Sequence, residues 1–166
     1  MSLQPHRPDP DAALAADVTE KLLRAASIVR DRLADALAEA GSNETRLTVM
    51  RTIAARGDEG CSQADLAFVL RQAESSVCTL IERMKKDGLV HRFRSKVDRR
   101  KSFLMLTSEG ADRLQEAVRG YEAAVAELSR AWRSEAEPLR RLLDQLLFAL
   151  ERPVPGSSDL DLRKAA

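Results

Sequence analysis

The chain has 166 residues, of which 4 % are aromatic, and its formal net charge at pH 7 is +1. This length suits one domain with extensions, and the frequent Ala, Leu and Arg favour helices over sheets. Two cysteines are too few for a disulfide framework. No apolar run is long enough to span a membrane, and the N-terminus lacks the apolar core of a signal peptide. We therefore expect a soluble, cytoplasmic protein with no membrane partner.

The first quarter of the chain predicts an arm followed by a long helix. Residues 1–10 include three prolines and little that can pack, which is typical of a flexible arm. From about residue 12 to residue 40, apolar residues recur mostly every three or four positions, and Gly41 follows as a stop. A second helix, capped by Ser42 or Asn43, follows the glycine. Its expected inner face consists of Leu47, Met50, Ile53 and Ala54.

Two short helices come next, separated by a turn near residues 71–73. Ser62 and Asp65 form a capping-box pattern, because a hydroxyl and a carboxylate can both satisfy free N–H groups at a helix start. Gly88 ends the second short helix. Two short helices joined by such a turn are typical of a helix-turn-helix. The core residues expected from the pair are Leu66, Val69, Leu70, Val77, Leu80, Ile81 and Met84.

A basic hairpin follows the helix-turn-helix directly. Two apolar strands are predicted over Leu89–Arg94 and Ser102–Thr107, with a cationic tip between them. The segment 71–101 holds ten Lys and Arg residues and four acidic ones, so it carries +6 and the rest of the chain −5. A helix with hydroxyls and cations followed by a basic hairpin predicts a winged helix-turn-helix that binds duplex DNA.

The last third of the sequence predicts two more helices. Thr107 or Ser108 can cap the first, and Pro138 marks the start of the second, which has a stripe of leucines. The first has apolar residues at alternating spacings of four and three, typical of a coiled-coil seam. These residues are Leu114, Val118, Tyr121, Val125, Leu128 and Trp132. Such apolar stripes predict a homodimer, although a helical bundle within one chain fits the same spacing.

The segment from Ser62 to Gly110 resembles the MarR family of bacterial transcriptional regulators. The resemblance depends on four short motifs in order: SQADLA in the first short helix, DGLV after the second, DRR at the hairpin tip, and LTSEG at the next helix start. It implies a winged-helix dimer that binds a roughly palindromic operator. It also implies release of the operator by a small-molecule effector or by thiol oxidation.

This sequence departs from the family pattern in three places. In the family, the second short helix is the recognition helix. The turn and the cap before it have Arg71 and Ala73 here, where the family usually has Gly and Ser. Thr79 stands where an Arg is common in the recognition helix, and Ser95 replaces an acidic residue early in the wing. These departures affect the turn geometry and the operator sequence rather than the fold.

Candidate DNA-binding residues lie in two groups. On the recognition helix, hydroxyls and a cation oppose the core stripe and can contact bases or phosphates; for the two serines, N-terminal capping is the alternative. These residues are Ser75, Ser76, Thr79 and Arg83. In the wing, the candidates are Arg94, Lys96, Arg99, Arg100 and Lys101. The resemblance suggests that Asp98 braces the wing by pairing with Arg100, which leaves Arg99 for the minor groove; the two arginines can also exchange these roles.

The remaining chemistry of the sequence is sparse. Cys61 and Cys78 are candidate redox residues, but for Cys61 burial as a small hydrophobe is the favoured interpretation. The sequence has no metal-ligand spacing, no Gly-rich phosphate loop and no nucleophile elbow. We therefore expect no enzyme activity, no metal and no cofactor.

The sequence as a whole predicts a mainly α (α+β) protein. The expected parts are a flexible arm (1–10), an N-terminal dimerisation helix (11–41), a winged helix-turn-helix lobe (42–107), C-terminal dimerisation helices (108–151) and a flexible tail (152–166). The expected function is sequence-specific binding of double-stranded operator DNA by a homodimeric transcriptional regulator, a repressor released by a small ligand or signal. The alternatives are a protein-interaction module on a winged-helix scaffold and a thiol-based redox sensor.

Overall fold

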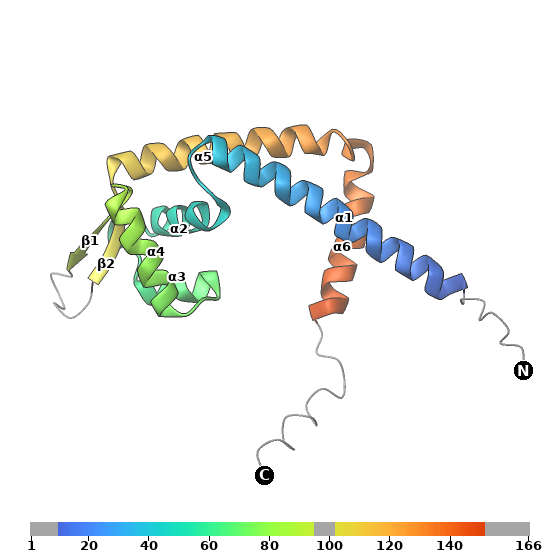
Figure 1. The fold of residues 1–166 in the computed structure, drawn as a ribbon, viewed down its shortest axis with the longest axis horizontal. Coiled ribbons are helices and arrows are strands. Elements are labelled where there is room, and N and C mark those ends of the chain that lie inside the picture. The colour runs from blue at the N-terminus through green and yellow to red at the C-terminus, as the bar shows by residue number, and fades with distance from the viewer. Residues whose placement is uncertain (1–9, 95–101, 152–166) are drawn as a thin grey trace, which may run out of the picture. The chain divides into compact units, whose positions relative to one another are not determined.

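The computed structural model of the chain describes residues 10–94 and 102–151 (Figure 1). The chain divides into two compact units, Met1–Ala126 and Glu127–Ala166, and each is considered by itself. The helices of the described residues are α1 (Pro10–Glu39), α2 (Glu44–Ala55), α3 (Gln63–Leu70), α4 (Glu74–Lys86), α5 (Ser108–Ser129) and α6 (Ala136–Glu151). They also contain the short 3-10 helices η1 (Gly57–Glu59) and η2 (Arg133–Glu135), and the strands β1 (Val90–Arg94) and β2 (Ser102–Leu106).

The main core lies in the lobe formed by α2, α3, α4 and the two strands. Val77, Ile81 and Met84 recur every three or four residues and are fully buried, so α4 packs by one stripe. Cys61 joins the sheet edge by exchanging two backbone hydrogen bonds with Leu104, at 3.0 and 2.9 Å. The buried residues of this core are Val49, Met50, Ile53, Cys61, Leu66, Ala67, Val77, Ile81, Met84, Leu89, Val90 and Leu104.

Side-chain caps determine where the helices of the lobe begin. The Asn43 side chain accepts a hydrogen bond from the Arg46 N–H, so Asn43, and not Ser42, is the N-cap of α2. The capping box predicted at α3 is confirmed, because Ser62 and Asp65 each accept from the other's backbone N–H. Thr107 caps α5 by accepting from the Gly110 N–H at 2.9 Å.

The strands form an antiparallel hairpin with Val90 opposite Leu106 and Phe93 opposite Phe103. The two phenyl rings lie 5.7 Å apart between centroids, which is a favourable cross-strand aromatic pair. Gly60 lies against this pair. Its φ of 72° and ψ of 170° belong to a region of backbone space that is essentially restricted to glycine.

A second, smaller core joins α1, α2 and α5. Leu37, Ala40, Leu47 and Ala117 are buried together, and the Arg113 guanidinium donates to the backbone oxygen of Ala40 at 3.3 Å. The partly buried residues that pack against this core are Leu114, Val118 and Tyr121. Half of the predicted coiled-coil seam is therefore covered within one chain, as the helical-bundle alternative required. Trp132 lies beyond the end of α5, so its assignment to the seam was wrong.

Two of the predicted core residues are also misplaced. Ala54 is exposed on α2, where Val49 is buried in its place, and Val69 is 46 % exposed on α3, where Ala67 is buried. The buried side of each helix is rotated slightly from the predicted one because the partner elements, rather than the apolar spacing alone, decide it. Among the described residues, no helix is both long and apolar enough to cross a membrane.

Candidate nucleic-acid interface

The face of α4 opposite its core stripe carries all four predicted recognition residues. Ser75, Ser76, Thr79 and Arg83 are exposed, whereas Val77, Ile81 and Met84 are buried. The N-cap of α4 is Ala73, which makes no side-chain cap hydrogen bond. The capping role considered for the two serines is therefore wrong, and their hydroxyls lie within the first turn beside the free N–H groups of the helix end.

The turn before α4 adopts an unusual backbone conformation. Arg71 is in the left-handed region, with φ of 51° and ψ of 42°, where the family resemblance suggested a glycine. An Arg in this region costs about 1 kcal/mol relative to glycine. The turn is nevertheless closed by backbone hydrogen bonds from Arg71 N to Phe68 O and from Gln72 N to Ala67 O. The departure in sequence therefore leaves the helix-turn-helix intact.

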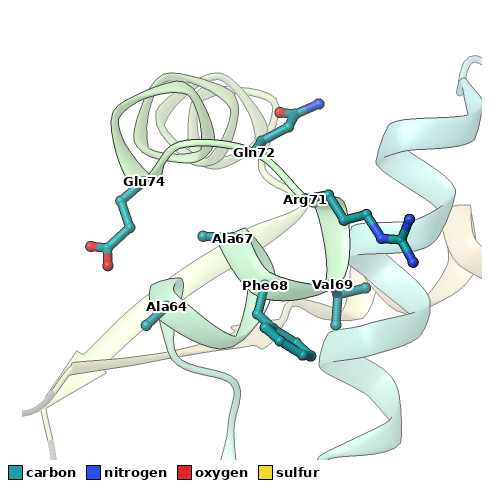
Figure 2. Close-up of a pocket in the computed structure, with 7 residues that line it drawn as sticks. All are labelled: Ala64, Ala67, Phe68, Val69, Arg71, Gln72 and Glu74. Atoms are coloured by element: carbon teal, nitrogen blue, oxygen red, sulfur yellow. The ribbon is translucent and has the colours of Figure 1, made fainter. Parts of the chain in front are cut away.

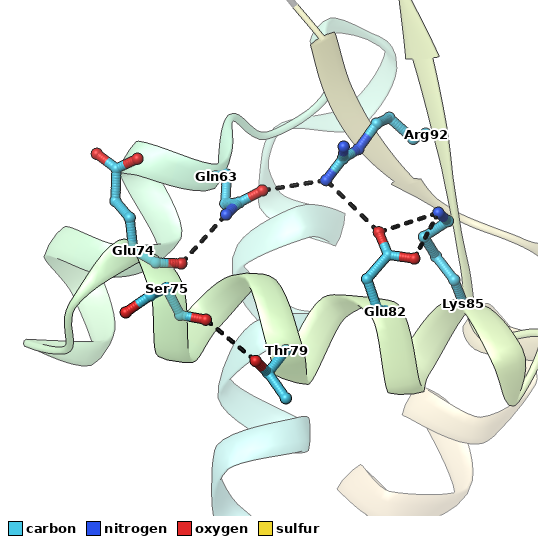
Figure 3. Close-up of polar contacts among 7 residues, drawn as sticks. All are labelled: Gln63, Glu74, Ser75, Thr79, Glu82, Lys85 and Arg92. Atoms are coloured by element: carbon cyan, nitrogen blue, oxygen red, sulfur yellow. Dashed lines mark hydrogen bonds and ion pairs between the residues drawn. The ribbon is translucent and has the colours of Figure 1, made fainter.

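A polar network connects the start of α3, the whole length of α4 and strand β1 (Figure 3). The Gln63 amide donates to the backbone oxygen of Glu74 at 3.2 Å, and its oxygen accepts from Arg92 at 3.0 Å. Arg92 also lies 3.9 Å from the Glu82 carboxylate, which accepts from Lys85 at 2.9 Å. Arg92 thus joins α3, α4 and β1, so the network fixes the orientation of α4 relative to α3 and the strand.

Glu82 is an acidic residue on the recognition helix among cations. The hydrogen bond from Lys85 lowers the pKa of its carboxyl, and the charges of Lys85, Arg92 and Lys86 lower it further. The carboxylate is therefore anionic at neutral pH and partly neutralises Lys85 and Arg92. Of the cations on α4, Arg83 and Lys86 are exposed, and Arg83, one turn beyond Thr79, is the candidate for contact with a phosphate or a guanine.

The C-terminal end of α4 is fixed by a separate ion pair. Arg46, in the first turn of α2, donates from its guanidinium to the carboxylate of Asp87, the C-cap of α4. No local sequence pattern predicts the four positioning residues Arg46, Asp87, Gln63 and Arg92. The hydrogen bonds that join them in pairs, Arg46 with Asp87 and Gln63 with Arg92, span 41 and 29 positions of the chain.

The wing is described only in part. Arg94 is exposed at the end of β1, where it can face a phosphate backbone. The other predicted wing residues, Lys96, Asp98, Arg99, Arg100 and Lys101, lie outside the described residues.

A hollow of about 860 Å³ lies beside α3 and the turn (Figure 2). Its walls are mainly apolar, and Phe68 is 85 % exposed there. The lining residues are Ala64, Ala67, Phe68, Val69, Arg71, Gln72 and Glu74. None of the four recognition residues on α4 lines it, so this hollow is separate from the candidate interface.

The two cysteines have different environments. Cys61 is fully buried, and burial, followed by the nearby Asp65 carboxylate, raises the pKa of its thiol. The burial predicted for Cys61 as a small hydrophobe is confirmed, and a protonated, buried thiol reacts slowly with oxidants. Cys78 is partly buried on α4. Among the residues that the structure describes, no group of three or more His, Cys, Asp or Glu side chains can hold a metal ion.

A capped helix-turn-helix followed by an antiparallel hairpin defines a winged-helix protein. Residues 42–101 match the model of the MarR family, so this lobe is similar to the family that its motifs resemble. The comparison with curated protein sequences found no match.

Solved structures share the fold over most of the chain. The transcriptional repressor CouR, bound to a 23-mer DNA duplex, is 22 % identical, with a TM-score of 0.67 over 88 % of this chain and 100 % of that one. The MepR–DNA complex from S. aureus is 18 % identical, with a TM-score of 0.64 over 78 % and 96 %. The YusO protein from Bacillus subtilis is 20 % identical, with a TM-score of 0.64 over 87 % and 100 %. These similarities show that the winged-helix fold predicted from the sequence is correct.

Proposed function

We propose that this chain is a sequence-specific, double-stranded DNA-binding transcriptional regulator. The observation that carries the proposal is the outward face of α4, where three hydroxyls and Arg83 are exposed together opposite a fully buried core stripe. A helix of this kind fits the major groove, and the adjacent hairpin with Arg94 can contact the flanking backbone. CouR and MepR, which share the fold, have been solved bound to DNA. CouR is a repressor, and repression is the mode that we propose here.

The regulator would act as a homodimer. Along α1, Leu14, Val18 and Leu23 are 63, 48 and 68 % exposed, an apolar surface that a soluble monomer rarely leaves uncovered. The leucine stripe of α6 is likewise exposed, at 64 % for Leu142 and 71 % for Leu150. A two-fold dimer would cover these surfaces and supply two recognition helices to half-sites about 34–36 Å apart.

Each part of the chain predicted from the sequence would have its own role. The arm (1–10) and the tail (152–166) would flank a dimerisation helix (11–41), the DNA-binding lobe (42–107) and C-terminal dimerisation helices (108–151). Release of the operator would follow from a small-molecule effector or another signal that changes the spacing of the two lobes. The protein would work in the cytoplasm and would not be an enzyme.

Selection of bound sequences from a random DNA pool tests this function directly. The expected result is enrichment of a two-fold symmetric sequence whose half-sites are about one helical turn apart. Affinity for the selected duplex should fall steeply with salt, because Lys and Arg displace counterions from phosphates. A pool without enrichment, together with salt-independent binding, would favour the alternative of a protein-interaction module. Unchanged operator affinity after peroxide treatment would exclude the redox-sensing alternative.

A further inference from the structure

Thr79 lies at the centre of the outward face of α4. It follows the core residue Val77 by two positions, which places it roughly 200° around the helix from the buried stripe, and its side chain is exposed. By the same geometry Ser76 and Arg83 lie to one side of Thr79 and Ser75 to the other. If α4 enters the major groove by this face, Thr79 therefore lies at the middle of its contact with the duplex.

The hydroxyl of Thr79 is already engaged within the helix. Its Oγ1 donates a hydrogen bond to the backbone oxygen of Ser75 at 3.2 Å (Figure 3). This is the bond to the preceding turn that stabilises one of the side-chain conformations of threonine in helices. Because the hydroxyl turns back toward Ser75, the methyl group of Thr79 points away from that backbone oxygen (Figure 3).

The side chains around Thr79 allow a close approach to base edges. Ser75 and Ser76 are short and exposed, so the first turns of α4 carry little bulk on this face. The hydrogen bond from Gln63 to the backbone oxygen of Glu74 fixes the start of α4 against α3. A short side chain can read a base only when its backbone is both close to the groove and held in place, and these two features meet that need.

We propose that Thr79 recognises thymine by packing its methyl group against the C5-methyl group of the base in the major groove. The proposal depends on the DNA-binding function proposed above and specifies one position of the operator. Thymine presents a methyl group in the major groove, and the methyl group of Thr is one of its apolar partners in protein–DNA contacts. With its hydrogen donated to Ser75, the hydroxyl can accept from adenine or cytosine but has no hydrogen left for a guanine oxygen.

The test replaces thymine by uracil, which lacks only the C5-methyl group. After a bound sequence has been selected with the full chain, each thymine of a half-site is exchanged in turn and the affinity is measured at fixed salt. For the unmodified chain, the exchange at one thymine of the half-site should weaken binding about fourfold. This factor corresponds to the free energy of burying one methyl-sized group. A chain that binds every uracil duplex as well as its thymine parent would overturn the proposal.

Two matched variants assign the effect to Thr79. Thr79→Ser keeps the hydroxyl and removes the methyl group, so it should bind the thymine and uracil duplexes equally at that position. Thr79→Val keeps a methyl group and removes the hydroxyl, with a similar helix propensity, so it should retain the preference for thymine. Thermal unfolding of both variants checks that the fold is unchanged.

The possible failures are distinguishable. If Thr79→Ser still discriminates thymine from uracil, another residue recognises the methyl group and the proposal is wrong. If Thr79→Val loses affinity while Thr79→Ser keeps it, the hydroxyl accepts a hydrogen bond from a base and the proposal is also wrong. If the random pool yields no enriched sequence, the DNA-binding function itself fails before Thr79 is tested.

Discussion

At the scale of single residues, Gly60 shows how one position holds the wing against the lobe. A Cβ atom at this position would lie 2.8 Å from Phe93 Cε1 and 2.8 Å from Phe103 Cβ. An alanine would also be strained at the φ of 72°. Gly60→Ala should therefore lower the free energy of unfolding by about 2–4 kcal/mol, from strain and overpacking together, as measured by urea denaturation.

Gly88 supplies the matched control for this substitution. Its φ is 73°, but a Cβ atom there would meet nothing within 4 Å. Gly88→Ala should cost only the backbone strain, about 1 kcal/mol. Equal decreases in the unfolding free energy of the two variants would mean that the Phe93 and Phe103 side chains shift at no energetic cost. That result would contradict the expected effect of overpacking.

The wing arginines remain a residue-scale prediction from the sequence, because residues 95–101 are not described. Arg99→Ala should weaken operator binding by about 1–3 kcal/mol in a gel shift at fixed salt, with dimerisation intact. Lys96→Ala should instead weaken binding to all sequences alike and reduce the salt slope by about one unit. An effect of Arg100→Ala in place of Arg99→Ala would exchange the roles of the two arginines, and no effect of either would remove both from the interface.

At the scale of elements, the eight-residue helix α3 depends on its capping box. Ser62→Ala removes the side-chain acceptor for the Asp65 N–H, and it should lower the free energy of unfolding by about 1 kcal/mol. Ser42→Ala is the control, because Asn43 and not Ser42 caps the neighbouring helix α2. A loss from Ser42→Ala as large as that from Ser62→Ala would show that the cap is not the cause.

The same capping box predicts a pH dependence. Hydrogen bonds from the Ser62 side chain and then from its backbone lower the pKa of the Asp65 carboxyl below its ordinary value of 3.8. A lowered pKa in the folded state gives stability that is present above pH 3.8 and disappears as the pH falls through the lowered pKa. The difference in unfolding free energy between the unmodified chain and Asp65→Asn should therefore shrink in acid. A difference that stays constant down to pH 2 would contradict this linkage.

The elements also show which features a sequence can predict. Caps and core stripes are local, so Ser62, Gly88 and the spacing of Val77 and Ile81 predicted α3, α4 and their ends. The link from Gln63 to Arg92 spans 29 residues and arises only when the wing folds onto the helices. Its residue types, a glutamine and an arginine, are ordinary for an exposed surface, so no local signal distinguishes them.

At the scale of the whole molecule, the apolar seam of α5 shows the limit of periodicity. Leu114, Val118 and Tyr121 pack on the small core of α1 and α2 within one chain, and Arg51 lies over the Tyr121 ring at 5.4 Å. Farther along, Val125 is 40 % exposed. The spacing of four and three is the same whether the partner is an intramolecular helix or a second copy. Only the tertiary structure separates the covered part of the seam from the exposed part.

The uncovered apolar surface leads to a prediction about assembly. Leu142 is 64 % exposed on α6, so a charge there should harm a dimer interface more than the fold of one chain. We expect the unmodified chain to sediment at twice its chain mass of 18.4 kDa and Leu142→Glu to shift toward the monomer. Gln145→Glu introduces the same charge on the polar side of the helix and should remain a dimer.

DNA binding reveals whether that dimer is the functional unit. A monomer brings one recognition helix and half of the phosphate contacts, so the slope of log affinity against log salt should fall to about half for Leu142→Glu. Its affinity for the full selected site should fall to that for an isolated half-site, whereas Gln145→Glu should distinguish the two sites as the unmodified chain does. A monomeric Leu142→Glu variant that kept the full salt slope and the full-site preference would show that one lobe suffices, and the paired-half-site mechanism would be wrong.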